Sequence, residues 1–170
     1  MFYTKNDLPE DVRQNIIHLF QELLSDGIDL MLQTKQAHWN VKGSQFIAVH
    51  KLFDRIHKEV KEGVDNVAER IVQLGGVAQG TCQVISKNTT LPEYPLNIFD
   101  WQEHAEFLSD SIAAFCSLTR KGIDQVSDWN DPVSEDILIK ISRDLEKDLW
   151  FVESHLFQDK ADDSDIQEVA

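Results

Sequence analysis

The chain has 170 residues, of which 42% are hydrophobic, with only 7 glycines and 4 prolines. That composition excludes a disordered or fibrous polymer and suits one domain with a substantial core. Sixteen basic and thirty acidic residues give a formal charge of −14, which repels nucleic acids and anionic lipid at long range and attracts cations.

The first two predicted helices carry clear apolar periodicity. One runs from about residue 7 to 37, with Pro9 in its first turn. The other runs from about 44 to 74, and its apolar positions recur every three or four residues from Phe46 to Leu74. Gly75-Gly76 then ends it.

The stretch from Val77 to Phe99 is mixed and contains Pro92 and Pro95, so it predicts a long crossing connection with room for a short helix. A third helix is predicted to begin at Asp100, which forms a capping-box pattern with Glu103.

A fourth helix is predicted to begin near Asp131-Pro132, again a cap followed by proline. Together the segments predict an all-α, ferritin-like four-helix bundle with a long crossover connection between the second and third long helices. We expect the bundle to occupy residues 1–158 and an acidic C-terminal tail to occupy 159–170.

The smaller signals concern compartment and core. Two cysteines, Cys82 and Cys116, are too few for a disulfide framework, and we expect both to be buried thiols. No apolar run approaches the roughly 18 residues of a membrane span, and MFYTKNDLPED lacks the apolar stretch of a secretory signal, so we expect a cytosolic protein. Trp101 and Trp150 are predicted to lie in the core.

Side chains able to bind a metal gather on the second predicted helix and in the turn before it. His50 and Asp54 are four residues apart, as are Asp65 and Glu69, so each pair shares a helix face away from the apolar stripe. His38 precedes the helix. Imidazole and carboxylate together suit Fe(II), Zn(II) or Mn(II).

One helix cannot bring both pairs to one metal, because the fifteen residues from His50 to Asp65 span about 22 Å. An antiparallel second copy would remove the difficulty and create two identical sites. The alternative is a solvated face shared with lysines, and spacing alone favours that interpretation. The chain also contains no Glu-x-x-His pattern, which counts against a di-iron site inside one bundle.

The run from His38 to His50 (HWNVKGSQFIAVH), then Phe53-Asp54 and the run DNVAER at residues 65–70, resembles the signature of the Dps-type mini-ferritins. The similarity continues through Leu74-Gly75-Gly76, Tyr94-Pro95-Leu96 and residues 142–154, and covers about residues 3 to 158. It fixes many positions over thirty residues, which makes the resemblance specific.

The resemblance implies a hollow homododecamer in a bacterial cytoplasm or nucleoid. It implies a ferroxidase centre at which Fe(II) is oxidised to Fe(III) by hydrogen peroxide or dioxygen, with two irons per centre and Zn or Mn as competitors. His38, His50 and Asp54 would come from one chain, and Asp65 and Glu69 from its mate, with Trp39 bordering the centre. The ferric product would be stored inside, which protects against oxidative stress.

A second hypothesis is a nucleoid-binding structural protein in which iron oxidation is secondary. DNA binding in some members of this family uses a lysine-rich N-terminal arm, whereas Lys5 is the only basic residue before Arg13 here. We therefore predict weak or absent DNA binding. A plain helical bundle without a metal role is a third alternative.

The remaining candidates are less specific. Family cages admit iron through acidic three-fold pores, and four acids lie in the corresponding region: Asp124, Asp128, Asp131 and Glu135. For any one of these acids, an ordinary exposed carboxylate or helix cap is the favoured interpretation. His57 is predicted to be a surface or interface histidine, and His18, His104 and His155 lack a ligand-spaced partner, so we expect them to be structural.

Overall fold

The computed structural model describes residues 1–157 and contains five helices in that range. In chain order they are α1 (Glu10–Asn40), α2 (Phe46–Gln73), α3 (Cys82–Asn88), α4 (Trp101–Asp128) and α5 (Pro132–Leu156). The acidic tail predicted at 159–170 lies outside the described residues.

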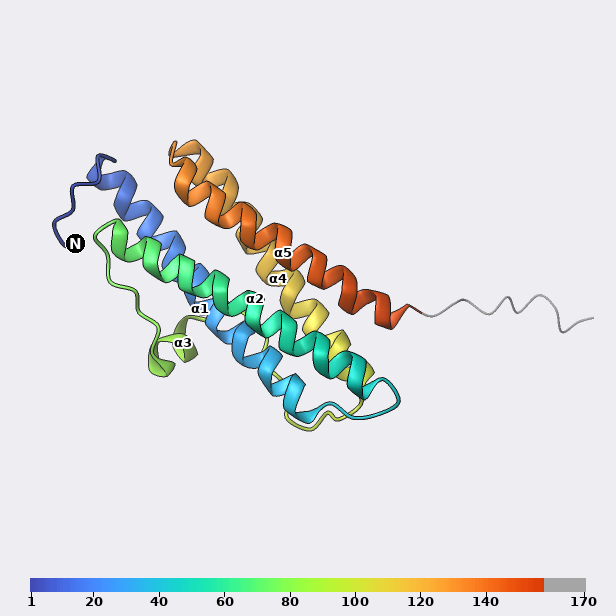
Figure 1. The fold of residues 1–170 in the computed structure, drawn as a ribbon. Coiled ribbons are helices and arrows are strands. Elements are labelled where there is room, and N and C mark those ends of the chain that lie inside the picture. Colours follow the sequence, from blue (N-terminus) through green and yellow to red (C-terminus); the bar gives the residue numbers. More distant parts are fainter. Residues whose placement is uncertain (158–170) are drawn as a thin grey trace, which may run out of the picture.

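The four long helices form one bundle, and the predicted architecture is confirmed (Figure 1). α1 packs along α2 and α4 along α5, while α1 against α4 and α2 against α5 close the bundle. The connection from α2 to α4 crosses the outside of the bundle and carries the short α3, which contacts α1. None of the helices in residues 1–157 combines the length and the hydropathy of a membrane span.

The core follows the apolar stripes of the long helices. Phe20 on α1 and Phe53 on α2 are completely buried, with Ile112 from α4 and Leu138 from α5. Along the stripe on α2, Phe46 at the helix start is exposed and Val64 is partly buried. Burying these side chains supplies the main driving force for folding, at roughly 1.5–3 kcal/mol for each large apolar group.

Two helices end on backbone motifs that need the left-handed conformation. Gly75 has φ +90° after α2, and Gly76 donates to the carbonyl of Ile71 at 2.9 Å, the pattern of a Schellman cap. A side chain at Gly75 would meet the carbonyl oxygen of Phe2 at 2.7 Å. Asn130, with φ 57°, adopts the left-handed conformation after α4. Both helix ends are therefore determined by residues of the turn itself.

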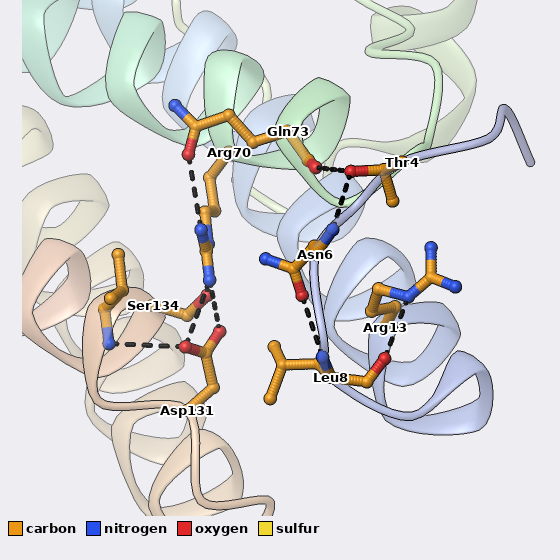
Figure 2. Close-up of polar contacts among 9 residues, drawn as sticks. Thr4, Asn6, Leu8, Arg13, Arg70, Gln73, Asp131 and Ser134 are labelled. Carbon is orange, nitrogen blue, oxygen red and sulfur yellow. Dashed lines mark hydrogen bonds and ion pairs between the residues drawn. The ribbon is translucent and has the colours of Figure 1, made fainter.

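A buried ion pair joins the end of α2 to the turn before α5 (Figure 2). Arg70 Nη2 donates to both carboxylate oxygens of Asp131, at 3.0 and 2.8 Å, and Arg70 Nε donates to Ser134 Oγ at 2.9 Å. The same carboxylate caps α5 by accepting from the backbone N–H of Val133. The N-terminal segment lies alongside, where Thr4 donates to the carbonyl of Gln73.

At the opposite end of the bundle, the α1–α2 turn is bonded to the start of α4. Lys42 donates its N–H to Phe99, and Trp101 donates to Lys42, at 2.8 and 3.1 Å. Asp100 and Glu103 form the predicted capping box. On the outside, buried Asp26 of α1 accepts from both the backbone and the hydroxyl of Thr90, which holds the crossover against the bundle.

Three expectations differ from the structure. α1 continues through Asn40, so His38 lies on a helix rather than in a turn; the amide of Asn40 donates to the carbonyl of Gln36 and extends the last turn. Cys82 is exposed at the start of α3, and only Cys116 is buried. Trp150 is exposed, because its neighbour Leu149 takes the position that packs against the core.

Candidate metal half-site

His38 of α1 and His50 of α2 form a reciprocal pair. His38 Nδ1 lies 2.9 Å from the backbone carbonyl oxygen of His50, and His50 Nδ1 lies 2.7 Å from that of His38. The two rings stack with centroids 3.7 Å apart. Each histidine therefore fixes the orientation of the other, and the last turn of α1 is held to the first turn of α2.

This geometry also fixes which ring nitrogens are available. A carbonyl oxygen only accepts, so each Nδ1 must carry the hydrogen of the bond, and in the neutral form of each ring the lone pair lies on Nε2. Neutral imidazole with Nδ1–H bonded to a carbonyl is the usual arrangement of a histidine that binds a metal through Nε2. The backbone carbonyls are thus the supporting groups that the sequence could not identify.

Asp54 follows His50 by one turn of α2 and is paired with two lysines. Lys35 Nζ lies 2.7 Å from Asp54 Oδ1, and Lys58 Nζ lies 2.8 Å from Oδ2. The hydrogen bond from Lys35, followed by that from Lys58, holds the pKa of Asp54 well below its usual range. The carboxylate is therefore anionic, and each of its oxygens already contacts one ammonium group.

Lys35 is the residue of this site that the sequence did not single out. It lies three residues before His38, so the two share a face of α1 once α1 is known to continue through Asn40. Because the helix was expected to stop near residue 37, that relationship was not apparent. The i, i+3 spacing on a correctly extended helix would have placed Lys35 on the same face as His38, but it does not show that Lys35 reaches Asp54.

Asp65 and Glu69 lie further along α2 and are both exposed. The helix between His50 and Asp65 is unbroken, so the separation of about 22 Å along the axis stands. Within residues 1–157, no three histidine, cysteine or acidic side chains come together closely enough to hold a metal. One protomer thus brings His38, His50 and Asp54 to one end of α2 and leaves Asp65 and Glu69 towards the other.

Exposed aromatic and apolar side chains occur close to the histidine pair in the sequence. Trp39 has 68% of its surface exposed and Ile47 has 60%. Phe46 lies beside the ring of His50, with centroids 5.0 Å apart. Apolar groups clustered at a polar site are typical of a surface that another protein covers.

His57 follows His50 by about two turns of α2. Its Nδ1 is 2.9 Å from the carbonyl oxygen of Met31, so it repeats the hydrogen-bond pattern of His38 and His50 across the α1–α2 seam. It is only partly exposed, and no carboxylate in residues 1–157 is bonded to it. Its observed contact is structural.

The four candidate pore acids separate into two groups. Asp124 and Asp128 of α4 are exposed and Glu135 in the first turn of α5 is partly exposed, so all three are accessible near the α4–α5 turn. Asp131 is only 3% exposed and is bonded to Arg70. Its carboxylate serves as a helix cap and an ion-pair partner.

Comparison with known proteins gives consistent matches over most of the chain. The ferritin-like domain family matches residues 17–161. The DNA protection during starvation protein of Agrobacterium fabrum is 44% identical over 153 residues, which are 90% of this chain and 94% of that protein.

Two solved structures are similar in fold as well as sequence. The tetragonal form of Mycobacterium smegmatis Dps has a TM-score of 0.88 with 36% identity, covering 93% of this chain and 95% of that one. The Dps of Microbacterium arborescens in its high iron form has a TM-score of 0.82 with 30% identity, covering 90% and 97%.

Proposed function

The chain is a Dps-type mini-ferritin of the ferritin-like family, and on that premise we propose that it oxidises Fe(II) and stores the ferric product, protecting the cell against oxidative damage. The names of its relatives support both parts of the proposal. One is called a DNA protection during starvation protein, and another is described in a high iron form.

The observation that carries the proposal is the reciprocal bonding of His38 and His50. It commits both Nδ1 atoms to carbonyls and leaves both Nε2 lone pairs for a metal, one helical turn from the anionic Asp54. Such a set is half of a ligand shell. We propose that Asp65 and Glu69 of a two-fold-related copy complete it, and that the exposed Trp39 borders the contact.

The donors suit the chemistry. Carboxylates are hard anionic ligands and favour Fe(III) over Fe(II), so they assist oxidation, while neutral imidazole retains Fe(II) before the reaction. Two Fe(II) ions bound as substrates supply both electrons that hydrogen peroxide needs to become two water molecules, with two protons consumed. Paired delivery avoids the hydroxyl radical that a single electron would release. Zn(II) and Mn(II) fit the same donors and are competitors.

The assembly follows from the same requirement. A site divided between two copies needs an isologous contact, in which each copy gives its histidine end and receives the acidic end of its neighbour. We propose a dodecamer built on such pairs, with dioxygen as an alternative oxidant. Asp124, Asp128 and Glu135 remain candidates for an acidic iron entrance in that cage.

A role in binding DNA directly is less well supported. The charge of −14 opposes approach to a polyanion. In the N-terminal segment, the guanidinium of Arg13 already donates to the carbonyls of Leu8 and Leu74. Lys5 is the other basic side chain of this segment. A gel shift that persists at moderate salt without added divalent metal would contradict this expectation.

The test loads the protein with Fe(II) without air, adds peroxide, and follows ferric absorbance and particle size. The double variant His50→Ala/Asp54→Ala is expected to lose rapid oxidation, whereas His18→Ala, on the exposed side of α1, keeps the parental rate. If the double variant oxidises iron as fast as the parent, the site assignment is wrong.

Coassembly separates a shared site from one within a single chain. His50→Ala/Asp54→Ala and Asp65→Ala/Glu69→Ala are each expected to be inactive alone. In a mixed pair, one of the two sites draws an intact histidine end from one chain and an intact acidic end from the other, so random mixing restores about a quarter of the parental sites. No recovery in well-mixed assemblies would refute the shared site.

A further inference from the structure

A second histidine contact, away from the half-site, joins the crossover to α4. The hydroxyl of Tyr94 lies 2.6 Å from His104 Nδ1. The phenol ring also packs edge-on against Phe107, with centroids 4.8 Å apart, and His104 is only 1% exposed. Tyr94 is partly buried against the core, and neither residue is part of a salt bridge among the described residues.

The position of the protons follows from burial. Desolvation lowers the pKa of His104, so the imidazole is neutral, and desolvation raises the pKa of Tyr94, so the phenol is protonated. A phenol hydroxyl is a strong donor and a neutral imidazole nitrogen is a good acceptor. The short contact is therefore an O–H···N bond that points the phenolic proton at Nδ1.

The pair lies at the same end of the bundle as the half-site. Lys42 follows His38 by four residues and is hydrogen-bonded to Trp101, which precedes His104 by three. The four residues from His38 to Lys42, one pairing distance and three helical residues place the backbones of His38 and His104 on the order of 20 Å apart. Gln33 of α1 strengthens the connection by donating to the carbonyl of Pro92, two residues before Tyr94.

We propose that Tyr94 donates single electrons to one-electron oxidants formed at the iron centre, and that His104 receives its phenolic proton. The inference rests on the proposed function, which supplies the oxidant whenever a centre holds one Fe(II) and reacts with peroxide. A hydroxyl radical takes one electron from Tyr94 and becomes hydroxide. Tyr94 becomes a neutral phenoxyl radical as its proton moves along the existing hydrogen bond, and His104 becomes imidazolium.

The hydrogen bond to His104 makes Tyr94 suited to donate single electrons. Loss of an electron from a phenol makes it a strong acid, so oxidation is easiest where an acceptor already holds the proton. Tyr3, the other tyrosine of the chain, is 90% exposed and has no histidine bonded to it among the described residues. His104 acts through Tyr94 and is a positioning residue. A later Fe(II) can return the phenoxyl to tyrosine.

The experiment uses the assembled protein with one Fe(II) per centre, mixed with peroxide and frozen for electron paramagnetic resonance. The parent is expected to show a tyrosyl radical. Tyr94→Phe is expected to lose it and to release more spin-trapped hydroxyl radical, and the matched control Tyr3→Phe is expected to retain it. His104→Gln tests the positioning role, because losing the imidazolium partner shifts the g-values of the radical.

A radical that survives in Tyr94→Phe, or a parent that forms ferric iron without any tyrosyl radical, overturns the inference. Ferric absorbance in the same samples reports separately on the proposed function. A flash-generated one-electron oxidant applied to the iron-free protein tests the pair without the iron site. There too, oxidation of Tyr94 in preference to Tyr3 is expected, and equal oxidation of both would contradict the role of His104.

Discussion

Arg70 Nη2 donates to both oxygens of Asp131, and this buried pair joins the last turn of α2 to the first turn of α5 (Figure 2). Burial alone raises the pKa of Asp131, but the hydrogen bond of Ser134 and the bonds from Arg70 outweigh it and hold the pKa below its usual value. The contact is therefore ionic at neutral pH, and it is enclosed where water cannot replace either partner.

Replacing Asp131 with alanine leaves the guanidinium of Arg70 buried without its counter-ion. We expect Asp131→Ala to lower the free energy of unfolding by about 3–5 kcal/mol, measured by urea denaturation. The control is Asp128→Ala, an exposed acid at the end of α4, with a change within about 0.5 kcal/mol. If both substitutions lower the free energy of unfolding equally, the buried ion pair contributes no more to stability than an exposed carboxylate does.

Asp100 caps α4 and is a smaller, local contributor. Its Oδ1 accepts from the backbone N–H of Gln102 at 2.9 Å, and Glu103 returns a bond to the N–H of Asp100. Asp100→Ala is expected to cost about 1 kcal/mol of unfolding free energy, whereas Asp100→Asn keeps most of the cap. The urea midpoints of both variants measure this difference. If both variants lose the same unfolding free energy, the cap is not what makes Asp100 stabilising.

The fold could be predicted from the sequence because the patterns that indicate each helix are local. Apolar spacing along α2 and the cap-and-proline pattern at Asp131-Pro132 each depend on residues within a few turns, so element type and order were predicted correctly. The error at the end of α1 arose because its last turn is extended by a side-chain bond from Asn40 to Gln36, which no periodicity reveals.

The site was accessible only in part. The residue types and the helical spacing made His50 and Asp54 candidate metal ligands, but spacing alone favoured a solvated face. The resemblance to the mini-ferritins supplied the expected ligand set, in which Asp65 comes from a second chain. Contacts between elements were not predictable, because nothing in the spacing says that His38 bonds the carbonyl of His50 or that Lys35 reaches Asp54. These depend on the packing of α1 against α2.

Asp148 of α5 gives the chain a predicted pH dependence. Burial and the adjacent Glu59 raise its pKa to about 7, against the opposing effect of Arg55, while an unfolded chain has an aspartate pKa near 3.9. Between about pH 4 and 7 the folded state therefore binds a proton that the unfolded state releases. The free energy of unfolding should fall as pH rises through this window, by at most about 1.4 kcal/mol per pH unit.

Asp148→Asn, which keeps the shape without the charge, is expected to flatten this slope. Urea midpoints compared at about pH 5 and about pH 7.5 measure it. Asp144→Asn is the matched control, one turn earlier on α5 and paired with Lys140 at 3.0 Å. A variant at Asp148 that retains the full parental slope would assign the pH dependence to other groups.

Lys35 is expected to compete with iron for Asp54. Its ammonium group lies 2.7 Å from Asp54 Oδ1, so a metal that binds this oxygen must displace it or share the carboxylate. Lys35→Met keeps much of the aliphatic length and removes the charge. We expect it to raise the affinity for Fe(II), measured anaerobically by titration calorimetry, by a factor of about two to five, since a partly exposed ion pair is a weak competitor.

Lys58→Met is the matched control for this competition. Lys58 bonds the other oxygen of Asp54 at 2.8 Å, but 71% of its side chain is exposed, so solvent already weakens the contact. Its substitution should change the affinity less than that of Lys35. If neither lysine alters binding while His50→Ala abolishes it, the metal does not use the oxygens of Asp54 that these ammonium groups contact, and the carboxylate must be removed from the proposed ligand set.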